Sequence, residues 1–483
     1  MIDPSIPMRP TPASSEERDR WEHTDLRMRM LRGEWEQDLD RRLQRMIDPA
    51  RYSSWGGRYA TDLSSNVFKS VVTQLACLYD RAPTLAHDTN ADGLIGPGGA
   101  MARSGVWSLM QRVAQMVIGS REYLVRASFT EEHGLRYRPI RPSLVSAAAD
   151  PERPEQPTYL KEARLRKHPE RDEWIWTWEI LDVSDPEAPQ YRIAESTTTG
   201  EGADLTAAYL GVESLSGDAY PYRRRDGRPV LPVVLYHAEN TGHLWDPYTW
   251  SEVVEGSLTA ALLFSFFTHA MRQASWPQRY GVNIRVPGAE TVDVEGAGRR
   301  QRLPTDPASL LLLESDGDVQ PMIGQFGPGA DVDTLLSSIM SYETRVASWA
   351  GVSASDVHRS GAARSGYAIA ISNEGKRAAA RRFEPQFRDG DTRLAMLSAI
   401  LLNRAKGTNF PEGGYRIRYE SVPESAEEKK GEREHILGLL DSGLMDMASA
   451  YQTLNPGTSR ADAEAALEQI RITNIRYRGT QAV

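Results

Sequence analysis

The sequence predicts an α+β fold that is mostly helical and carries two β-rich inserts. Near the N-terminus, apolar residues such as Leu31, Trp35 and Leu39 recur every four positions, which is typical of one face of a helix. Between residues 122 and 193 the period changes to two, as in half-buried antiparallel strands. A second region of short alternating runs covers residues 276–327 and lies between two stretches of helical period.

Length and composition narrow the class of protein. With 483 residues the chain is too long for one ordinary core, and we expect several domains. Its net charge of −9 argues against a protein that clamps nucleic acid over its whole surface, but not against one that lets DNA slide past. A single cysteine, Cys77, excludes an intrachain disulfide framework and fits synthesis in a reducing cytoplasm. The N-terminus lacks a signal-peptide pattern, and the most apolar run, 258–267, is too short to span a bilayer. We therefore expect a soluble protein with no membrane partner.

The first part of the chain predicts three helices, over residues 15–47, about 63–79 and about 101–118, each with apolar residues at helical spacing. After the β-rich insert, residues 228–237 read as one more strand.

The β-rich insert contains a row of three tryptophans, Trp174, Trp176 and Trp178. Such a row could stack on nucleic-acid bases, but it is more often the packed face of a sheet. We expect these residues in a core or an interface.

A long helix is predicted to follow, capped by Asp246 or Thr249 and running through Ala274. Its segment "LTAALLFSFF" is apolar on nearly all faces, so we expect it to be buried on most sides, including against neighbouring subunits.

Residues 276–330 are predicted to form short strands and turns. A basic cluster, Arg299, Arg300 and Arg302, is expected on a loop between two of these strands. The Asp-Gly pair at 316–317 is typical of a type I′ turn and predicts a hairpin there.

The central feature of the sequence is a helix, a polar hinge and a second, longer helix. Asp331 or Asp333 can cap the first helix, and Gly351 is placed to end it. Residues 351–365, "GVSASDVHRSGAARS", are small, polar and glycine-punctuated, which predicts a loop with backbone freedom at Gly351 and Gly361.

The longer helix is predicted to begin near Gly366 and to run to about Asn403. Pro385 removes a backbone donor inside it, so we expect a kink there. From Arg364 to Lys406 nine basic residues face four acidic ones, a local inversion of the net charge. A solvated helix face would account for this excess as well as a role in binding would.

No catalytic motif is found. The sequence has no GxxxxGK[ST] phosphate loop, no HExxH metal motif and no GxSxG elbow, and its nine histidines are scattered. We therefore expect no enzyme, and no catalytic, cofactor-binding or metal-binding residues.

The order of these elements resembles the portal proteins of tailed bacteriophages and related gene-transfer particles. The resemblance is sharpest where residues 335–350 are followed by "GVSASDVHRSGAARSGYAIAIS" and then by "EGKRAAARRFEP". It extends to "NVFKSVVTQLACLYDRAPTL" and "RVAQMVIGSREYLVRA" near the N-terminus, and covers roughly residues 20–473. A portal is the ring at one capsid vertex, the head–tail connector through which DNA is packaged and ejected.

The resemblance implies a portal-like fold with a wing, a stem, a clip and a crown. Its parts are a flexible arm (1–19), the wing (20–245), a first stem helix (246–275), the clip (276–330), a second stem helix (331–350), a tunnel loop (351–365), a long kinked helix that closes the wing (366–423), and a crown with the C-terminal tail (424–483).

The resemblance also implies which residues act. The tunnel loop would project into the DNA channel with Ser353, Ser355, Asp356, Val357, His358, Arg359 and Ser360. His358 and Arg359 would touch backbone phosphate, although Arg359 could instead pair with Asp356 or a neighbouring subunit. Gly351, Gly361 and Pro385 would act as hinges, and Arg299, Arg300 and Arg302 would face a partner on the clip.

The implied partners are further copies of the chain in a ring of about twelve, double-stranded DNA in the channel, the large terminase, the head–tail adaptor, and the major capsid and scaffold proteins. The implied location is the portal vertex of the virion after assembly in the host cytoplasm. Two alternatives remain: another ring-forming tail, baseplate or adaptor protein, and a DNA-processing enzyme with an unrecognised metal site.

Overall fold

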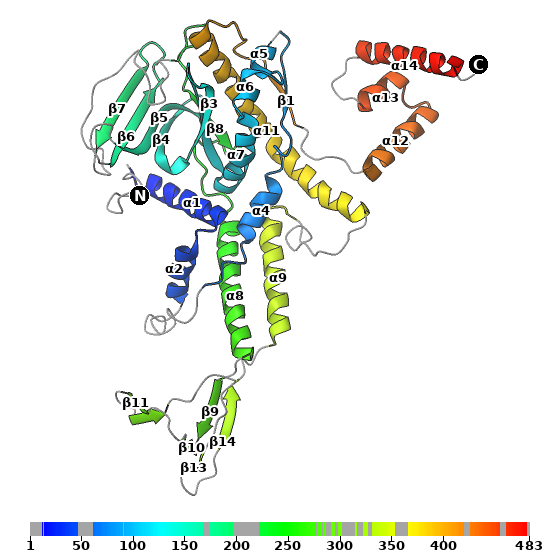
Figure 1. The fold of residues 1–483 in the computed structure, drawn as a ribbon. Helices are drawn as coiled ribbons and strands as arrows, with labels where there is room; N and C mark the ends of the chain where they lie inside the picture. The colour runs from blue at the N-terminus through cyan, green and yellow to red at the C-terminus, as the bar shows by residue number, and fades with distance from the viewer. Residues whose placement is uncertain are drawn as a thin grey trace. The chain divides into compact units, whose positions relative to one another are not determined.

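The structure is a computed structural model and has the α+β class that the sequence predicts (Figure 1). It divides into two compact units, one of Met1–Arg359 with Ala378–Ser421 and one of Ser360–Arg377 with Val422–Val483. The residues that it describes are 12, 14–46, 61–89, 91–167, 174–196, 222–275, 331–352, 366–419, 426–454 and 460–480, with short strands between 278 and 326.

The predicted helix over 15–47 is two helices, α1 (Ser15–Arg32) and α2 (Glu36–Met46). Gly33 separates them with φ of +79°; its N–H donates to the Met30 carbonyl, and the next N–H donates to the Arg29 carbonyl. This is a Schellman ending, which glycine adopts without steric cost. The prediction was wrong here because the apolar stepping continues across the break.

The next two predicted helices are also shorter than expected. The second is α4 (Val67–Leu75), capped by the Asn66 side chain. The third is split into α6 (Ala100–Arg103) and α7 (Val106–Ser120), because Gly105 between them has a positive φ of +70°. A further short helix, α5 (Asp92–Ile95), precedes them.

The strands of the first insert form two antiparallel sheets. The three-stranded sheet has the order β3-β2-β8, and the four-stranded sheet is a meander in the order β4-β5-β6-β7. The strands are β2 (Glu122–Thr130), β3 (Gly134–Ile140), β4 (Val145–Asp150), β5 (Arg153–Lys167), β6 (Trp174–Asp182), β7 (Gln190–Ser196) and β8 (Val233–His237), with a 3-10 turn, η1 (Pro142–Leu144), before β4.

Two of the three tryptophans of β6 are core residues, as predicted. Trp176 and Trp178 are 2% and 3% exposed and pack with Ala163 of β5. Trp174, at the start of the strand, is half-buried.

A buried ion-pair network joins the two sheets. Arg126 of β2 donates two hydrogen bonds to Glu179 of β6, over 2.8 and 2.7 Å. Glu162 of β5 accepts from Arg138 and Arg164, and although burial favours its neutral form, these hydrogen bonds and charges lower its pKa to about 2. The Glu162 carboxylate is therefore ionised, and Glu179 is paired with Arg126.

The second insert lies between α8 (Ser251–Ser275) and α9 (Val332–Trp349) and consists of antiparallel pairs. The pairs are β9 (Gln278–Val282) with β14 (Met322–Phe326), β10 (Ile284–Arg285) with β13 (Glu314–Ser315), and β11 (Thr291–Val294) with β12 (Gly298–Gln301). Because β13 pairs with β10 and β14 with β9, the described strands do not form the predicted hairpin; residues 316–317 themselves lie outside the described part.

The long helix α11 (Gly366–Lys406) begins at the predicted residue and ends close to the predicted one. Its buried residues include Phe383, Phe387 and Leu394, and it continues through Pro385. The kink at Pro385 stays a prediction. After α11, β15 (Arg416–Arg418) pairs with β1 (Thr84–Ala86).

In the second unit, the C-terminal residues form three helices, α12 (Ala426–Asp441), α13 (Met447–Leu454) and α14 (Arg460–Thr480). Their core is small, with Ile436, Ala448, Ala450 and Ala463 as its buried apolar residues in the described part.

Candidate functional site: the helix pair α8 and α9

The helices α8 and α9 pack side by side, as Figure 1 shows. Gly256 of α8 is the point of close approach. A Cβ atom at this position would lie 2.7 Å from Cγ2 of Val346 and 2.9 Å from Cζ3 of Trp349, both on α9. The separation of the two helices therefore depends on the missing side chain.

Both ends of α9 were predicted correctly. The Asp331 side chain caps the first turn by accepting from the Thr334 N–H over 3.3 Å. At the other end Gly351 has φ of +78°, and its N–H donates to the Ser348 carbonyl over 3.0 Å. The Val352 N–H donates to the Ala347 carbonyl, also over 3.0 Å, which completes a Schellman motif. The end of α9 is thus fixed by glycine geometry.

The exposed part of α8 is apolar. In its first half Val253, Val254 and Leu258 are buried, but between residues 263 and 271 the apolar side chains are only partly covered. Leu263 is 37% exposed and Met271 is 39% exposed. Because large apolar side chains gain free energy when they leave water, this half of the helix is a surface that favours contact with another apolar surface.

By length and composition, Ser251–Met271 could also cross a membrane. Its mean hydropathy is 1.3, and 44% of that stretch is buried within the protein. The sequence reasoning missed this because it considered only the shorter run 258–267. A buried core helix has the same composition, so the finding alone is weak support for a membrane span.

Met340 and Trp349 of α9 are 41% and 43% exposed, but the other exposed residues of this helix are hydroxylic or charged and form one face. This face borders an open groove of about 560 Å³, and hydroxyls on it donate back to their own helix, Ser338 to the Thr334 carbonyl and Ser341 to the Ser337 carbonyl, both over 2.8 Å. We call this surface the hydroxyl face. Its exposed residues are Asp333, Thr334, Ser337, Ser338, Ser341, Arg345 and Ser348.

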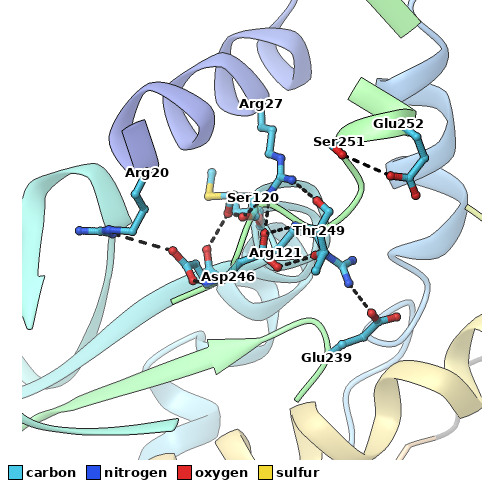
Figure 2. Close-up of polar contacts among 11 residues, drawn as sticks. Arg20, Arg27, Ser120, Arg121, Glu239, Asp246, Thr249, Ser251 and Glu252 are labelled. Atoms are coloured by element: carbon cyan, nitrogen blue, oxygen red, sulfur yellow. Dashed lines mark hydrogen bonds and ion pairs between the residues drawn. The ribbon is translucent and has the colours of Figure 1, made fainter. Parts of the chain in front are cut away.

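The N-terminal end of α8 is held by a buried ionic junction (Figure 2). Arg27 of α1 is 2% exposed and donates to the Ser120 carbonyl over 3.2 Å, to Asp246 over 3.2 Å and to the Thr249 carbonyl. One side chain thus ties α1 and the end of α7 to the turn that leads into α8.

Asp246 organises that turn, and it does not cap the helix. Its carboxylate accepts from the Thr249 N–H over 2.9 Å, while α8 begins only at Ser251. The residue before α8 is Trp250, so the predicted cap was wrong by one residue for Thr249 and by four for Asp246. The bond from the Thr249 N–H to the Asp246 side chain spans three residues and fixes the turn before the helix.

Arg121 is the second buried cation of the junction. Its Nη2 lies 2.8 Å from Glu239, its Nε donates to Thr249 over 3.2 Å, and its guanidinium lies over the Trp250 ring. Burial lowers the pKa of Arg121 to about 10, so the side chain stays charged at neutral pH. The other oxygen of Glu239 pairs with Arg382 of α11.

The backbone of the junction holds three non-glycine residues in the left-handed region. These are Arg121, Tyr248 and Trp250, with φ of 75°, 62° and 62°. Each such residue costs about 1–2 kcal/mol. Two cation–ring contacts offset this cost, Arg121 over Trp250 at 4.3 Å and Arg27 over Tyr248 at 5.0 Å. The start of α8 is thus fixed by its surroundings.

Glu122 is the fully buried carboxyl of the junction. It accepts from the Asp246 N–H and lies 3.8 Å from Arg20. Burial raises the pKa of Glu122 to about 8, although Arg20 and the hydrogen bond act in the opposite direction. Glu122 is therefore mainly protonated at neutral pH.

The structure places only some of the residues that the sequence singled out. Ser353, Ser355, Asp356, Val357, His358, Arg359, Ser360, Gly361 and Arg302 lie outside the described residues, so their roles stay predictions. Arg299 and Arg300 belong to strand β12, opposite Asp293 and Val292, and not to a loop as predicted. The sequence predicted β11 from its short Val-x-Val alternation. Its partner, β12, is too polar for the sequence pattern to indicate a strand.

Several α11 cations are paired with acids. Arg382 pairs with Glu239, Arg388 with Glu384 and Arg393 with Asp389. For these three residues the interpretation as a charged structural face fits better than one as free binding groups.

Sequence reasoning missed the ionic junction. Its members Arg27, Arg121 and Glu239 are separated by about a hundred residues each, and nothing local distinguishes them from surface charges. The closest local signal is the aromatic turn "WDPYTW" before α8.

No protein-family model matches the chain, and no curated protein matches it significantly. Among the described residues, no cluster of three or more His, Cys, Asp or Glu side chains could hold a metal ion.

Proposed function

We propose that the chain is the subunit of a portal-type ring at one capsid vertex, through which double-stranded DNA is packaged and ejected. The observation that carries the proposal is the difference between the two helices of one pair. The second half of α8 leaves apolar side chains partly in solvent, while α9 presents the hydroxyl face.

The exposed apolar half of α8 supports self-association. Leu263, Met271 and the half-buried phenylalanines between them would be covered by the equivalent helix pair of the next copy. Repetition of one such contact around an axis would close a ring, and the resemblance to portal proteins implies about twelve copies. The same burial removes the need for a membrane around this helix.

The hydroxyl face supports the passage of DNA. Each contact between a cation and a phosphate adds affinity that must be broken before the DNA can move. Among the exposed residues of this face Arg345 is the one cation, and Asp333 opposes it in sign. A wall of hydroxyls can hydrogen-bond water and phosphate weakly without holding the strand.

The remaining parts take their roles from the same proposal. The strands between α8 and α9, with Arg299 and Arg300, would form the clip that meets the terminase and the head–tail adaptor. Residues 353–360 would reach into the channel, and 424–483 would form the crown. The capsid and scaffold proteins would surround the assembled ring in the virion.

The test is electron microscopy in negative stain, combined with native mass measurement, on the wild-type chain and two matched variants. Leu263→Glu places a charge on the apolar half of α8, and Ser341→Glu places the same charge on the hydroxyl face. We expect wild-type rings with a central hole, loss of rings in Leu263→Glu with an unchanged circular dichroism spectrum, and intact rings in Ser341→Glu.

Two outcomes would contradict the proposal. One is that the wild-type chain and the Leu263→Glu variant both stay monomeric at high concentration. The other is metal-dependent cleavage of plasmid DNA by the purified chain, which would favour the DNA-processing enzyme. A DNA-packaging assay tests the hydroxyl face separately. If rings of the Ser341→Glu variant package as little DNA as a control without the chain, while rings of the Asp333→Asn variant package more, the assignment of the hydroxyl face is supported.

A further inference from the structure

A second buried site lies in the middle of α11 and is independent of the proposed function. Asp391 is 0% exposed, and three tyrosine hydroxyls converge on its carboxylate. Tyr79 donates to Oδ2 over 2.8 Å, Tyr236 donates to Oδ1 over 2.9 Å, and Tyr419 donates to Oδ2 over 2.6 Å. We call these four residues the tyrosine clasp.

The clasp joins segments that are far apart in the sequence. Tyr79 follows α4, Tyr236 belongs to β8, and Tyr419 follows β15. The arrangement is tightly packed: the Tyr79 ring meets the Tyr419 ring edge-on at 5.6 Å, and a Cβ atom on Gly390 would lie 2.3 Å from the Tyr236 ring. The three hydroxyls are thus positioned by the core and not by chance contact.

The clasp has no cation. Asp391 forms no ion pair with a lysine, arginine or histidine of the described part of the chain, and its bonds are the three from the tyrosines. The nearest charges on α11 are paired with each other, Arg388 with Glu384 and Arg393 with Asp389.

The other titratable groups that face the clasp are one phenol and one carboxyl group. Tyr137 of β3 lies near Asp391, and its hydroxyl is bonded to Ser398 over 2.7 Å. Glu384 lies near Tyr419. A carboxylate in this setting is stabilised only by neutral donors, and burial raises the pKa of Asp391 to about 6 while the three hydrogen bonds lower it.

We propose that the tyrosine clasp is a proton-operated latch, in which protonation of Asp391 releases the Tyr419 hydroxyl. A carboxylate accepts hydrogen bonds at both oxygens, whereas a carboxylic acid must donate one hydrogen bond and accepts fewer. One of the two hydroxyls on Oδ2 then stops donating to it: it either accepts the proton of the acid or leaves for another partner.

Tyr419 is the donor that can turn. Tyr79 and Tyr236 are buried, so a hydroxyl that left Asp391 there would lose its bond to the carboxylate without access to water. Tyr419 is partly exposed and can bond to water instead.

Protonation of Asp391 and release of the Tyr419 hydroxyl must be thermodynamically linked. Each phenol bond that favours the carboxylate over the acid must weaken by the same free energy when the acid forms. Removal of the Tyr419 hydroxyl must therefore make Asp391 easier to protonate.

The experiment places 3-fluorotyrosine at position 419 of the full chain and follows its 19F chemical shift from pH 7.5 to pH 5. We expect a titration with a midpoint near pH 6 that moves the signal toward that of a solvent-exposed fluorotyrosine. Asp391→Asn should abolish the titration. The matched control is 3-fluorotyrosine at position 123, a buried tyrosine of β2 whose hydroxyl is bonded to Arg141 and which should show no such midpoint.

A second measurement covers the case in which Asp391→Asn does not fold. With the probe at Tyr236, Tyr419→Phe should move the midpoint to higher pH, because one stabilising donor is lost. A signal at position 419 that stays constant over this pH range, or a midpoint at Tyr236 that Tyr419→Phe leaves unchanged or lowers, would overturn the proposal.

Discussion

The guanidinium of Arg121 lies 4.3 Å from the centroid of the Trp250 ring, and both residues hold left-handed backbone conformations, with φ of 75° and 62°. Arg121 ends α7 and Trp250 immediately precedes α8. The strain at one end of each helix is thus stabilised by the side chain at the end of the other. This relationship makes the start of α8 a rigid point.

Two substitutions of Arg121 separate the contribution of its backbone to the free energy of unfolding from the contribution of its side chain. Arg121→Ala and Arg121→Gly both delete the pair with Glu239 and the contact with Trp250, which should cost about 3–5 kcal/mol of the free energy of unfolding. Glycine adopts the left-handed region freely, so the glycine variant should be more stable than the alanine variant by about 1–2 kcal/mol. Urea denaturation of the two variants measures the difference.

The matched control is the same pair of variants at Arg136, which is exposed on β3 and has no positive φ. There the order should reverse, with alanine more stable than glycine, because glycine loses more backbone entropy on folding. If the alanine and glycine variants had the same order of stability at both positions, the role assigned to the Arg121 backbone would be contradicted.

Glu122 predicts a pH dependence of stability. Its folded pKa, about 8, is raised above the ordinary value of 4.5 by burial. The stability that it contributes is therefore fully present below pH 4.5 and is lost as the pH rises through 8. Glu122→Gln removes this loss. Between pH 5 and pH 9 the free energy of unfolding of the variant, relative to that of the wild type, should therefore rise by about 4 kcal/mol at most.

Chemical denaturation at a series of pH values measures this gain, and Glu132→Gln is the control. Glu132 is 81% exposed, so its surroundings change little on unfolding, and its variant should follow the wild type at every pH. A Glu122→Gln curve parallel to that of the wild type would show that the carboxyl is already ionised in the fold.

Local signals in the sequence predicted the α+β class and the ends of α9. The Asp331 cap and the Gly351 ending were found because each acts on residues within one turn. The breaks in the first helices were missed for a physical reason. The apolar residues Leu31, Trp35 and Leu39 stay in step across Gly33, and one glycine inside a helix costs only about 1 kcal/mol, so the pattern alone does not reveal a break.

The contacts that assemble the candidate site could not be predicted. The junction joins Arg27, Arg121 and Glu239 across three separate elements, and the clasp joins Tyr79 to Asp391 across most of the chain. Their pairing depends on the packing of sheets and helices, which period and propensity do not determine. For α8 the sequence predicted a helix that is apolar on nearly all faces and buried on most sides; residues 263–271 are only partly covered, and their contact with neighbouring subunits stays a prediction.

The close approach of α8 and α9 gives the last prediction. In Gly256→Ala the new methyl group would lie 2.7 Å from Val346 and 2.9 Å from Trp349, and both belong to the rigid face of α9. Such overpacking should cost about 1–3 kcal/mol of the free energy of unfolding. Gly438→Ala makes the same change inside α12, where nothing lies within 4 Å, and should instead stabilise its unit by up to about 1 kcal/mol through helix propensity. Calorimetry of both variants measures these changes in stability. A Gly256→Ala variant as stable as the wild type would mean that the two helices can separate without cost. In that case α8 is not held against α9 as the proposed ring requires.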